Sequence, residues 1–280
     1  MITQHKDWTD EFPHTLTHRR AVLHFKTQLP VQTCQAFERL IAQPPAAKRV
    51  SEPLACPHSA LFTKRQQLDS LKKKLRVQWG NPKRNGMYDW TIEELINTSE
   101  AHKRGARVPC LVGYGYSRSR FGLIDDVFLI TQLLTGHVDG MTLLRTEPQK
   151  VATLIEAAFE LLHSLHQQGI VHMDLWAANV MLPEQGDGLA QAIDLENSFS
   201  VPTAFLSETL GFQFGFFYNR EVYRYITEAN YDALVEQALA NYPELERARF
   251  SRVYDISKHQ DIGRLERRDV FLKGLLARRW

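Results

Sequence analysis

One short segment, residues 169–196, restricts this chain more than any other feature. It contains the pattern H-x-D-x-x-x-x-N, formed by His172, Asp174 and Asn179, and then the apolar triplet Val-Met-Leu at 180–182. A second short apolar stretch follows and carries Asp194 between an isoleucine and a leucine. A tight loop between two short strands can turn Asp174 and Asn179, five residues apart, toward one cleft, and Asp194 can reach the same cleft from the next strand of the hairpin.

These residue types match the needs of phosphoryl transfer. That reaction needs an oriented acceptor hydroxyl and neutralisation of the charge on the transferred group. One carboxylate must stand apart from the metal and accept the hydroxyl proton, while an amide oxygen and a second carboxylate hold Mg²⁺. The segment therefore predicts an ATP-dependent, Mg²⁺-dependent phosphotransferase.

The hydrophobic pattern predicts an α+β chain with two lobes. Before residue 135 it indicates a short strand that ends at Lys64, a helix over Trp90–Lys103 and a buried strand over Val127–Leu134, with Gly113 and Gly115 in a turn between strands. From Val151 onward apolar residues recur at helical spacing up to Gly169, and further helices are predicted over 230–241 and 262–278. We expect a small, sheet-containing, nucleotide-binding N-lobe over 1–134 and a helical C-lobe with the catalytic loop over 135–280; the fold of residues 1–58 stays open.

Composition excludes several classes of protein. The three cysteines are widely spaced and lack a C-x-x-C pattern, which argues against a disulfide framework and a zinc site. The chain has no apolar run of about 18 residues and no secretory signal, so we expect a cytoplasmic location. The net charge is only +2, but residues 64–84 hold eight Lys/Arg against one acid and residues 247–279 hold ten against four. Such clusters suit an anionic partner, although a run such as Lys72–Lys74 is equally compatible with a solvated helix face.

The segment around Asp174 resembles the catalytic loop and metal-binding strand of the protein-kinase-like superfamily. More narrowly, the chain resembles the lipopolysaccharide core kinases, the Kdo/heptose kinase family. In that family a strand lysine, a helix and a Gly-x-x-Val-Pro turn precede an apolar strand, and here Gly105-Ala-Arg-Val-Pro109 supplies the turn. The similarity covers residues 59–200 and implies a bilobal protein-kinase-like fold.

The resemblance also implies roles for individual residues. Asp174 would be the catalytic base, Asn179 and Asp194 the metal ligands, and His172 the histidine that supports the loop. Lys64 would bind the ATP phosphates, with Arg65 and Lys48 as rivals, and Glu94 would hold that lysine, with Glu93 as its competitor. The backbone of Gln132 to Leu134 would meet the adenine.

Departures from the protein-kinase pattern favour a small acceptor over a protein. Residues 1–79 contain no glycine, so no glycine-rich phosphate loop precedes Lys64, and Trp176 stands where protein kinases usually carry a lysine. We expect phosphorylation of a sugar hydroxyl in the lipopolysaccharide inner core, on an anionic glycolipid or sugar acceptor, with peripheral contact at the inner membrane and no nucleic-acid partner. The alternatives are a kinase for a soluble acceptor such as an aminoglycoside or choline, and a pseudokinase-like regulatory binding module.

Overall fold

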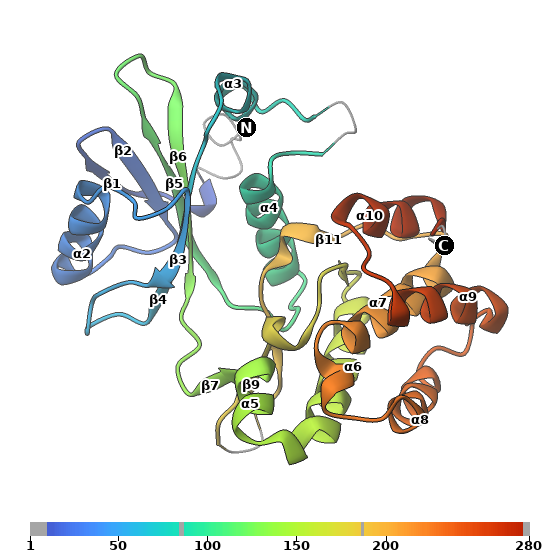
Figure 1. Cartoon of the computed structure of the whole chain (residues 1–280). Coiled ribbons are helices and arrows are strands. Elements are labelled where there is room, and N and C mark those ends of the chain that lie inside the picture. The colour runs from blue at the N-terminus through green and yellow to red at the C-terminus, as the bar shows by residue number, and fades with distance from the viewer. Residues whose placement is uncertain (1–9, 84–86, 186–187, 277–280) are drawn as a thin grey trace. The chain divides into compact units, whose positions relative to one another are not determined.

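The computed structural model describes residues 10–83, 87–185 and 188–276, and the chain divides into two compact units. The first unit comprises Met1–Ser99 and Pro109–Thr135, and the second comprises Glu100–Val108 and Gly136–Trp280. The first is rich in strands and the second is mainly helical, which confirms the α+β class (Figure 1). Residues 100–108, which we expected in the N-lobe, lie with the helical unit.

The first unit is built on a six-stranded antiparallel sheet in the order β1-β2-β5-β6-β4-β3. Its strands are β1 (His14–His18), β2 (Ala21–Phe25), β3 (Arg49–Pro53), β4 (Leu61–Gln67), β5 (Leu111–Arg118) and β6 (Ile124–Gln132). Helix α2 (Val31–Ala42) packs on one face, while α3 (Leu71–Trp79) and residues 90–99 of α4 (Trp90–Lys103) pack on the other (Figure 1).

Helices on both faces of the sheet explain the unbroken apolar run in β6. Successive side chains of a strand point to opposite faces. In β6, Phe128 and Ile130 pack against the α2 side, and Val127 and Leu129 pack against the α3 and α4 side. A strand buried on both faces reads as continuous apolar sequence rather than as an alternating pattern.

Two sequence predictions in this unit are wrong. Lys64 does not end its strand but lies in the middle of β4, which has β6 and β3 as neighbours. Gly113 and Gly115 do not form a turn but lie inside β5, opposite Phe25 and Leu23 of β2. A Cβ atom at Gly113 would lie 2.6 Å from the His24 carbonyl oxygen, so the close approach of β2 requires glycine there.

The second unit contains the principal helices α5 to α10 and two small sheets. The helices are α5 (Gly140–Thr146), α6 (Val151–Gln167), α7 (Leu206–Asn219), α8 (Glu228–Leu239), α9 (Arg247–His259) and α10 (Arg264–Lys273). The strands are β7 (His137–Asp139), β8 (Val171–His172), β9 (Val180–Pro183), β10 (Gln191–Ala192) and β11 (Ser198–Phe199), in the orders β10-β9-β7 and β11-β8. Short 3-10 helices η1 (Pro148–Lys150), η2 (Ala177–Asn179), η3 (Leu195–Asn197) and η4 (Val222–Arg224) connect them.

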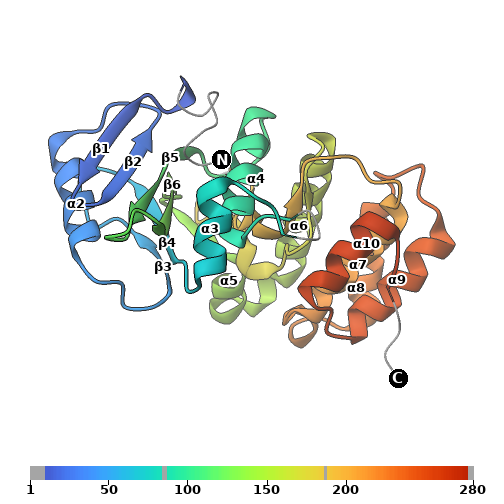
Figure 2. The same cartoon turned by 90° about the horizontal axis from the view of Figure 1, so that it is seen from above.

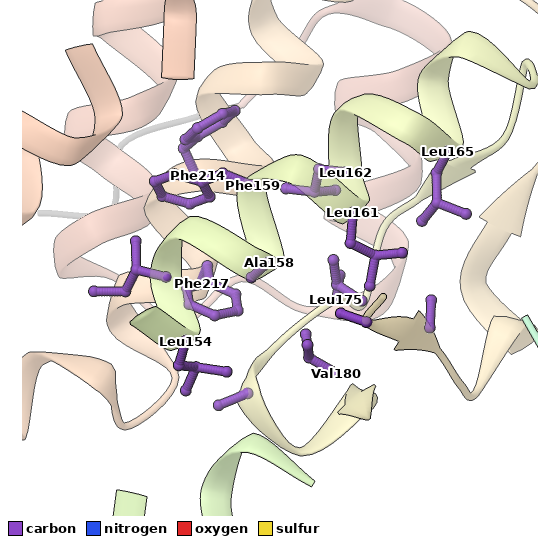
Figure 3. Close-up of a cluster of buried hydrophobic side chains, with 14 of the residues drawn as sticks. Leu154, Ala158, Phe159, Leu161, Leu162, Leu165, Leu175, Val180, Phe214 and Phe217 are labelled. Atoms are coloured by element: carbon purple, nitrogen blue, oxygen red, sulfur yellow. The ribbon is translucent and has the colours of Figure 1, made fainter. Parts of the chain in front are cut away.

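Helix α6 forms the centre of this unit. Its apolar stripe packs with Leu175 and Val180, which directly follow Asp174 and Asn179, and with Phe214 and Phe217 of α7 (Figure 3). Gly169 follows the helix in a left-handed conformation, with φ 67°, as the sequence predicted. The loop that carries Asp174 is thereby attached to a well-packed core, which is a prerequisite for a precise site.

Helices α7, α9 and α10 pack side by side (Figure 2). Helix α10 ends at Lys273, before Gly274, whereas we predicted a helix up to residue 278; Ala277 and Arg278 lie outside the described residues, as do Arg84 and Arg279. Cys34, Cys56 and Cys110 are free thiols. No helix in the described part of the chain combines the length and the apolar character that a membrane span requires.

Candidate active site

His172 joins the two chain segments that carry the predicted site in the helical unit. The side chain is fully buried on β8. The Asp174 backbone N–H donates to its Nδ1 at 3.2 Å, so the ring proton lies on Nε2, which donates to the carbonyl oxygen of Ile193 at 3.0 Å. The neutral imidazole therefore links the loop that holds Asp174 to the residue just before Asp194.

Asn179 is fixed in the same network. Its Nδ2 donates to the carbonyl oxygen of Asp174 at 2.9 Å, and its own carbonyl oxygen accepts from the Ile193 backbone N–H at 3.0 Å. With the amide nitrogen turned toward Asp174, the amide oxygen faces away from that carbonyl and can serve as a ligand. The structure thus brings Asp174, Asn179 and Asp194 together at one end of the β9–β10 hairpin.

Asp194 has a backbone conformation that few residues other than glycine adopt. Its φ and ψ are 64° and 58°, in the left-handed region, directly before η3. Such strain persists only where the surrounding structure imposes it, and it is concentrated at functional sites. The carboxylate oxygens of Asp194 and Glu196 come within 4.8 Å of each other. Carboxylate and amide oxygens are the donors that Mg²⁺ prefers, so the residues present fit this ion.

Two arginines of α10 contact the acidic side chains of this site. Arg267 is 8% exposed, and its Nη1 donates to Oδ1 of Asp174 at 2.5 Å. Arg264 forms an ion pair with Glu196, and its Nη2 lies 3.9 Å from Oδ2 of Asp174. The Asp174 carboxylate is therefore held from one side by guanidinium groups that lie about 90 residues later in the sequence.

The motif in the sequence did not point to these arginines or to Glu196 as part of the site. The signal was present in the basic run 247–279, and Arg264 and Arg267 have the i, i+3 spacing that places two side chains on one helix face. Burial lowers the pKa of the Arg267 guanidinium, and the neighbouring Asp174 carboxylate opposes that shift. The Arg267 guanidinium also lies over the Phe216 ring, 4.2 Å from its centroid, which shields it from solvent.

In the strand-rich unit, Lys64 pairs with Glu94 of α4. The competitor Glu93 instead accepts a hydrogen bond from the Tyr88 backbone N–H at 2.7 Å near the start of α4. Glu94 also has a second cation nearby, because Nη2 of Arg49 lies 3.8 Å from its Oε2. A buried carboxylate thus holds Lys64 in place.

The two rivals of Lys64 have other partners. Arg65 donates to Oδ2 of Asp126 at 3.1 Å and lies on the α2 side of the sheet, over the Phe128 ring. Lys48 is an exposed side chain 3.7 Å from Asp69. This geometry favours Lys64 over both as the residue that meets a nucleotide.

The predicted adenine-binding segment follows β6. The backbone N–H of Gln132 donates to the Cys110 carbonyl and that of Leu133 donates to the Ala60 carbonyl, each at 2.9 Å. Both N–H groups therefore already donate to carbonyl oxygens of the strand-rich unit. A hydrogen bond from this segment to adenine would therefore involve Leu134 or a carbonyl oxygen.

A known family covers the part of the chain that carries these residues. Residues 57–201 match the lipopolysaccharide kinase (Kdo/WaaP) family, which is more than half of the chain. The chain belongs to this family. The family is one of kinases, so the predicted lipopolysaccharide kinase family, kinase fold and kinase activity are confirmed, and membership implies the use of ATP.

Solved structures show weaker similarity. WaaP in complex with acyl carrier protein has 17% identity and a TM-score of 0.39, over 74% of this chain and 92% of that chain. A Stt7 homolog from Micromonas algae, soaked with ATP, has 18% identity and a TM-score of 0.35, over 56% of this chain and 52% of that chain. A search of curated protein sequences finds no match. These similarities are too low to assign any residue, so the roles within the site depend on the geometry above.

Proposed function

We propose that this kinase transfers the γ-phosphoryl group of ATP to a hydroxyl of a sugar in the inner core of lipopolysaccharide. The observation that carries the proposal is the buried network in which His172 ties the Asp174 loop to the strand before Asp194. Such a network fixes three oxygen-bearing side chains before substrate arrives. Pre-positioning is the main contribution that a protein makes to phosphoryl transfer.

Asp174 is the proposed base. Its Oδ1 is occupied by Arg267, while Oδ2 lies 3.9 Å from the nearest nitrogen of Arg264 and can accept the proton of an acceptor hydroxyl. Asn179 and Asp194 are the proposed magnesium ligands. Bound there, Mg²⁺ would neutralise charge on the phosphates. His172 supports the loop and takes no part in proton transfer, because both ring nitrogens already have backbone partners.

Lys64 and Glu94 are the proposed phosphate-binding pair, and the Gln132–Leu134 segment is the proposed adenine contact. Arg49 stands next to this pair through Glu94. Because residues 1–79 contain no glycine, no glycine-rich phosphate loop precedes Lys64. The guanidinium of Arg49 could take over the role of that loop, since a guanidinium binds phosphate oxygens with two parallel hydrogen bonds.

An anionic glycolipid or sugar is the proposed acceptor. Basic residues of α9 that remain exposed, such as Arg247 and Arg249, are compatible with a negatively charged partner. The same charge supports peripheral contact with the cytoplasmic face of the inner membrane, where anionic lipids attract basic side chains. A polycationic acceptor such as an aminoglycoside would instead need acidic side chains.

The first test is thermal stabilisation of the purified protein by ATP, with and without Mg²⁺. We expect an upward shift of Tm that depends on Mg²⁺ and is lost in Asp194→Asn, because that change removes one ligand charge. In Asp174→Asn the shift should persist while transfer to deacylated lipopolysaccharide falls at least a thousandfold, since the base is lost but the metal ligands remain. Equal loss of nucleotide binding in both variants would contradict this division of roles.

A further inference from the structure

A polar pocket in the helical unit opens beside the catalytic loop. Its volume is about 480 Å³, within the range of roughly 300–1,000 Å³ that is typical of small-molecule sites. Trp176, two residues after Asp174, contributes one wall, and the C-terminal end of α7 contributes another. The lining includes two arginines, two aromatic rings, an amide and a carboxylate: Arg145, Arg220, Trp176, Tyr223, Asn219 and Asp261.

The charge of this pocket favours an anion. Within the described part of the chain, neither Arg145 nor Arg220 forms an ion pair, and both side chains are exposed. Glu221 also lines the pocket, but it is paired with Arg224 at 3.0 Å. The remaining acid, Asp261, is a single carboxylate against two guanidinium groups, so the pocket keeps a positive excess.

Arg220 connects the pocket to the catalytic carboxylate. Its guanidinium lies over the Trp176 ring, 5.0 Å from the centroid, and 5.8 Å from the centroid of Phe216. The guanidinium of Arg267, which donates to Asp174, lies over the same Phe216 ring. Arg220 is therefore linked to Asp174 through the Phe216 ring and Arg267, and the pocket wall formed by Trp176 lies two residues after Asp174 in the chain.

The aromatic and amide side chains of the pocket are of the types that bind sugars. Aromatic side chains such as Trp176 and Tyr223 offer apolar surface to the C–H groups of a pyranose ring. The Nδ2 of Asn219 donates to the Gln260 carbonyl at 2.8 Å, which leaves its amide oxygen as an acceptor for a hydroxyl. A guanidinium binds a carboxylate or phosphate group with two parallel hydrogen bonds.

We infer that this pocket binds the acceptor sugar through an acidic substituent, with Arg220 as the residue that determines specificity and Arg145 as a second cation. The inference rests on the proposed function, because it places the acceptor of that reaction. It adds that a carboxylate or phosphate near the accepted hydroxyl is needed for binding. A neutral sugar of the same size should bind poorly.

The test uses Kdo, an octulosonic sugar with one carboxylate, and its uncharged methyl ester as probes in ligand-observed NMR titrations of the full chain. We expect Kdo to bind at least tenfold more tightly than the ester. Arg220→Ala should remove that difference. Arg220→Lys should keep part of it, since a lysine retains the positive charge but cannot form the two parallel hydrogen bonds of a guanidinium. The matched control is Arg252→Ala, which removes one exposed positive charge from α9 of the same unit.

Two outcomes would overturn the inference. Equal affinity for Kdo and its ester in the wild type would show that the pocket does not recognise the acid. An equal loss of affinity for Kdo in Arg220→Ala and Arg252→Ala would show that only the net charge of the protein matters. Mg-ATP stabilisation, measured on the same samples, separates this from the proposed function: if it persists while Kdo fails to bind, the kinase proposal stands and the pocket assignment falls.

Discussion

Arg267 is the residue whose removal should reveal most about the site. It is buried, it holds Oδ1 of Asp174, and its Nε donates to the Ile262 carbonyl at 2.9 Å. Arg267→Ala leaves a buried carboxylate without its closest partner, and breaking a buried pair typically costs about 3–5 kcal/mol of stability. Arg267→Lys should fold but hold Asp174 less well, so we expect kcat to fall at least tenfold with the Mg-ATP shift of Tm intact.

The matched control for this prediction is Lys273→Ala on the same helix. Lys273 pairs with Asp269 at the surface, and exposed pairs contribute about 0–1 kcal/mol, so its loss should change kcat and stability little. Unchanged kcat in Arg267→Lys would mean that the position of Asp174 is set by its backbone hydrogen bonds alone. In that case Arg267 would be a purely structural residue.

At the scale of elements, the packing of α7 against α9 depends on two glycines one turn apart. A Cβ atom at Gly211 would lie 2.5 Å from the Phe250 carbonyl oxygen, and one at Gly215 would lie 2.6 Å from the Tyr254 carbonyl oxygen. Glycine to alanine normally stabilises a helix by about 0.4–1 kcal/mol. Here we expect the opposite sign: Gly215→Ala should destabilise by about 1–3 kcal/mol in urea unfolding, because backbone atoms cannot move aside.

Gln237→Ala is the control for helix propensity, since Gln237 is exposed on α8. It should be neutral or slightly stabilising. A stabilising Gly215→Ala would show that α9 can shift outward without loss. In that case we would also expect little change in the pocket lined by Trp176 and Arg220, even though Arg220 directly follows α7.

The same elements show what the sequence could and could not predict. The helix that begins at Val151 was predictable because its apolar residues recur at helical spacing and a glycine follows it, and helix Trp90–Lys103 was predictable because Gly105 and Val108-Pro109 mark its end; all of these are local signals. The strand position of Gly113 was not, because its cause is the main chain of β2, about 90 residues earlier. For the same reason the motif predicted Asp174, Asn179 and Asp194 as site residues but gave no sign of Arg267, whose approach depends on how α10 packs.

At the scale of the whole molecule, charge counted along the sequence differs from charge at the surface. The basic run 247–279 suggested a surface for an anionic partner, yet Lys258, Arg267 and Arg268 are buried. Lys258 is paired with Glu228 and Asp232, and Arg268 lies over the Phe199 ring. Part of the apparent patch therefore stabilises the helical unit, so the salt dependence of acceptor binding should be weaker than the count of basic residues suggests.

Global stability should also depend on pH through a buried histidine. Burial, with a smaller effect of His163, lowers the pKa of His166 from 6.5 to about 4. Between these values the unfolded chain binds a proton that the folded chain does not, so stability rises with pH. Acidification from pH 6.5 toward pH 4 should therefore reduce the free energy of unfolding, by at most about 1.4 kcal/mol per pH unit from this residue.

The variant that isolates this contribution is His166→Gln, which removes the titrating group. It loses the hydrogen bond that His166 Nδ1 shares with the Tyr242 hydroxyl at 2.9 Å, so its stability at pH 7.5 should be lower than that of the wild type. Its loss of stability between pH 6.5 and pH 4.5 should nevertheless be smaller, because one proton fewer is bound on unfolding. His58→Gln, at an exposed position, should retain the wild-type slope. If the slopes of all three proteins agree in urea titrations, His166 is protonated in the folded state and its environment is more polar than its burial indicates.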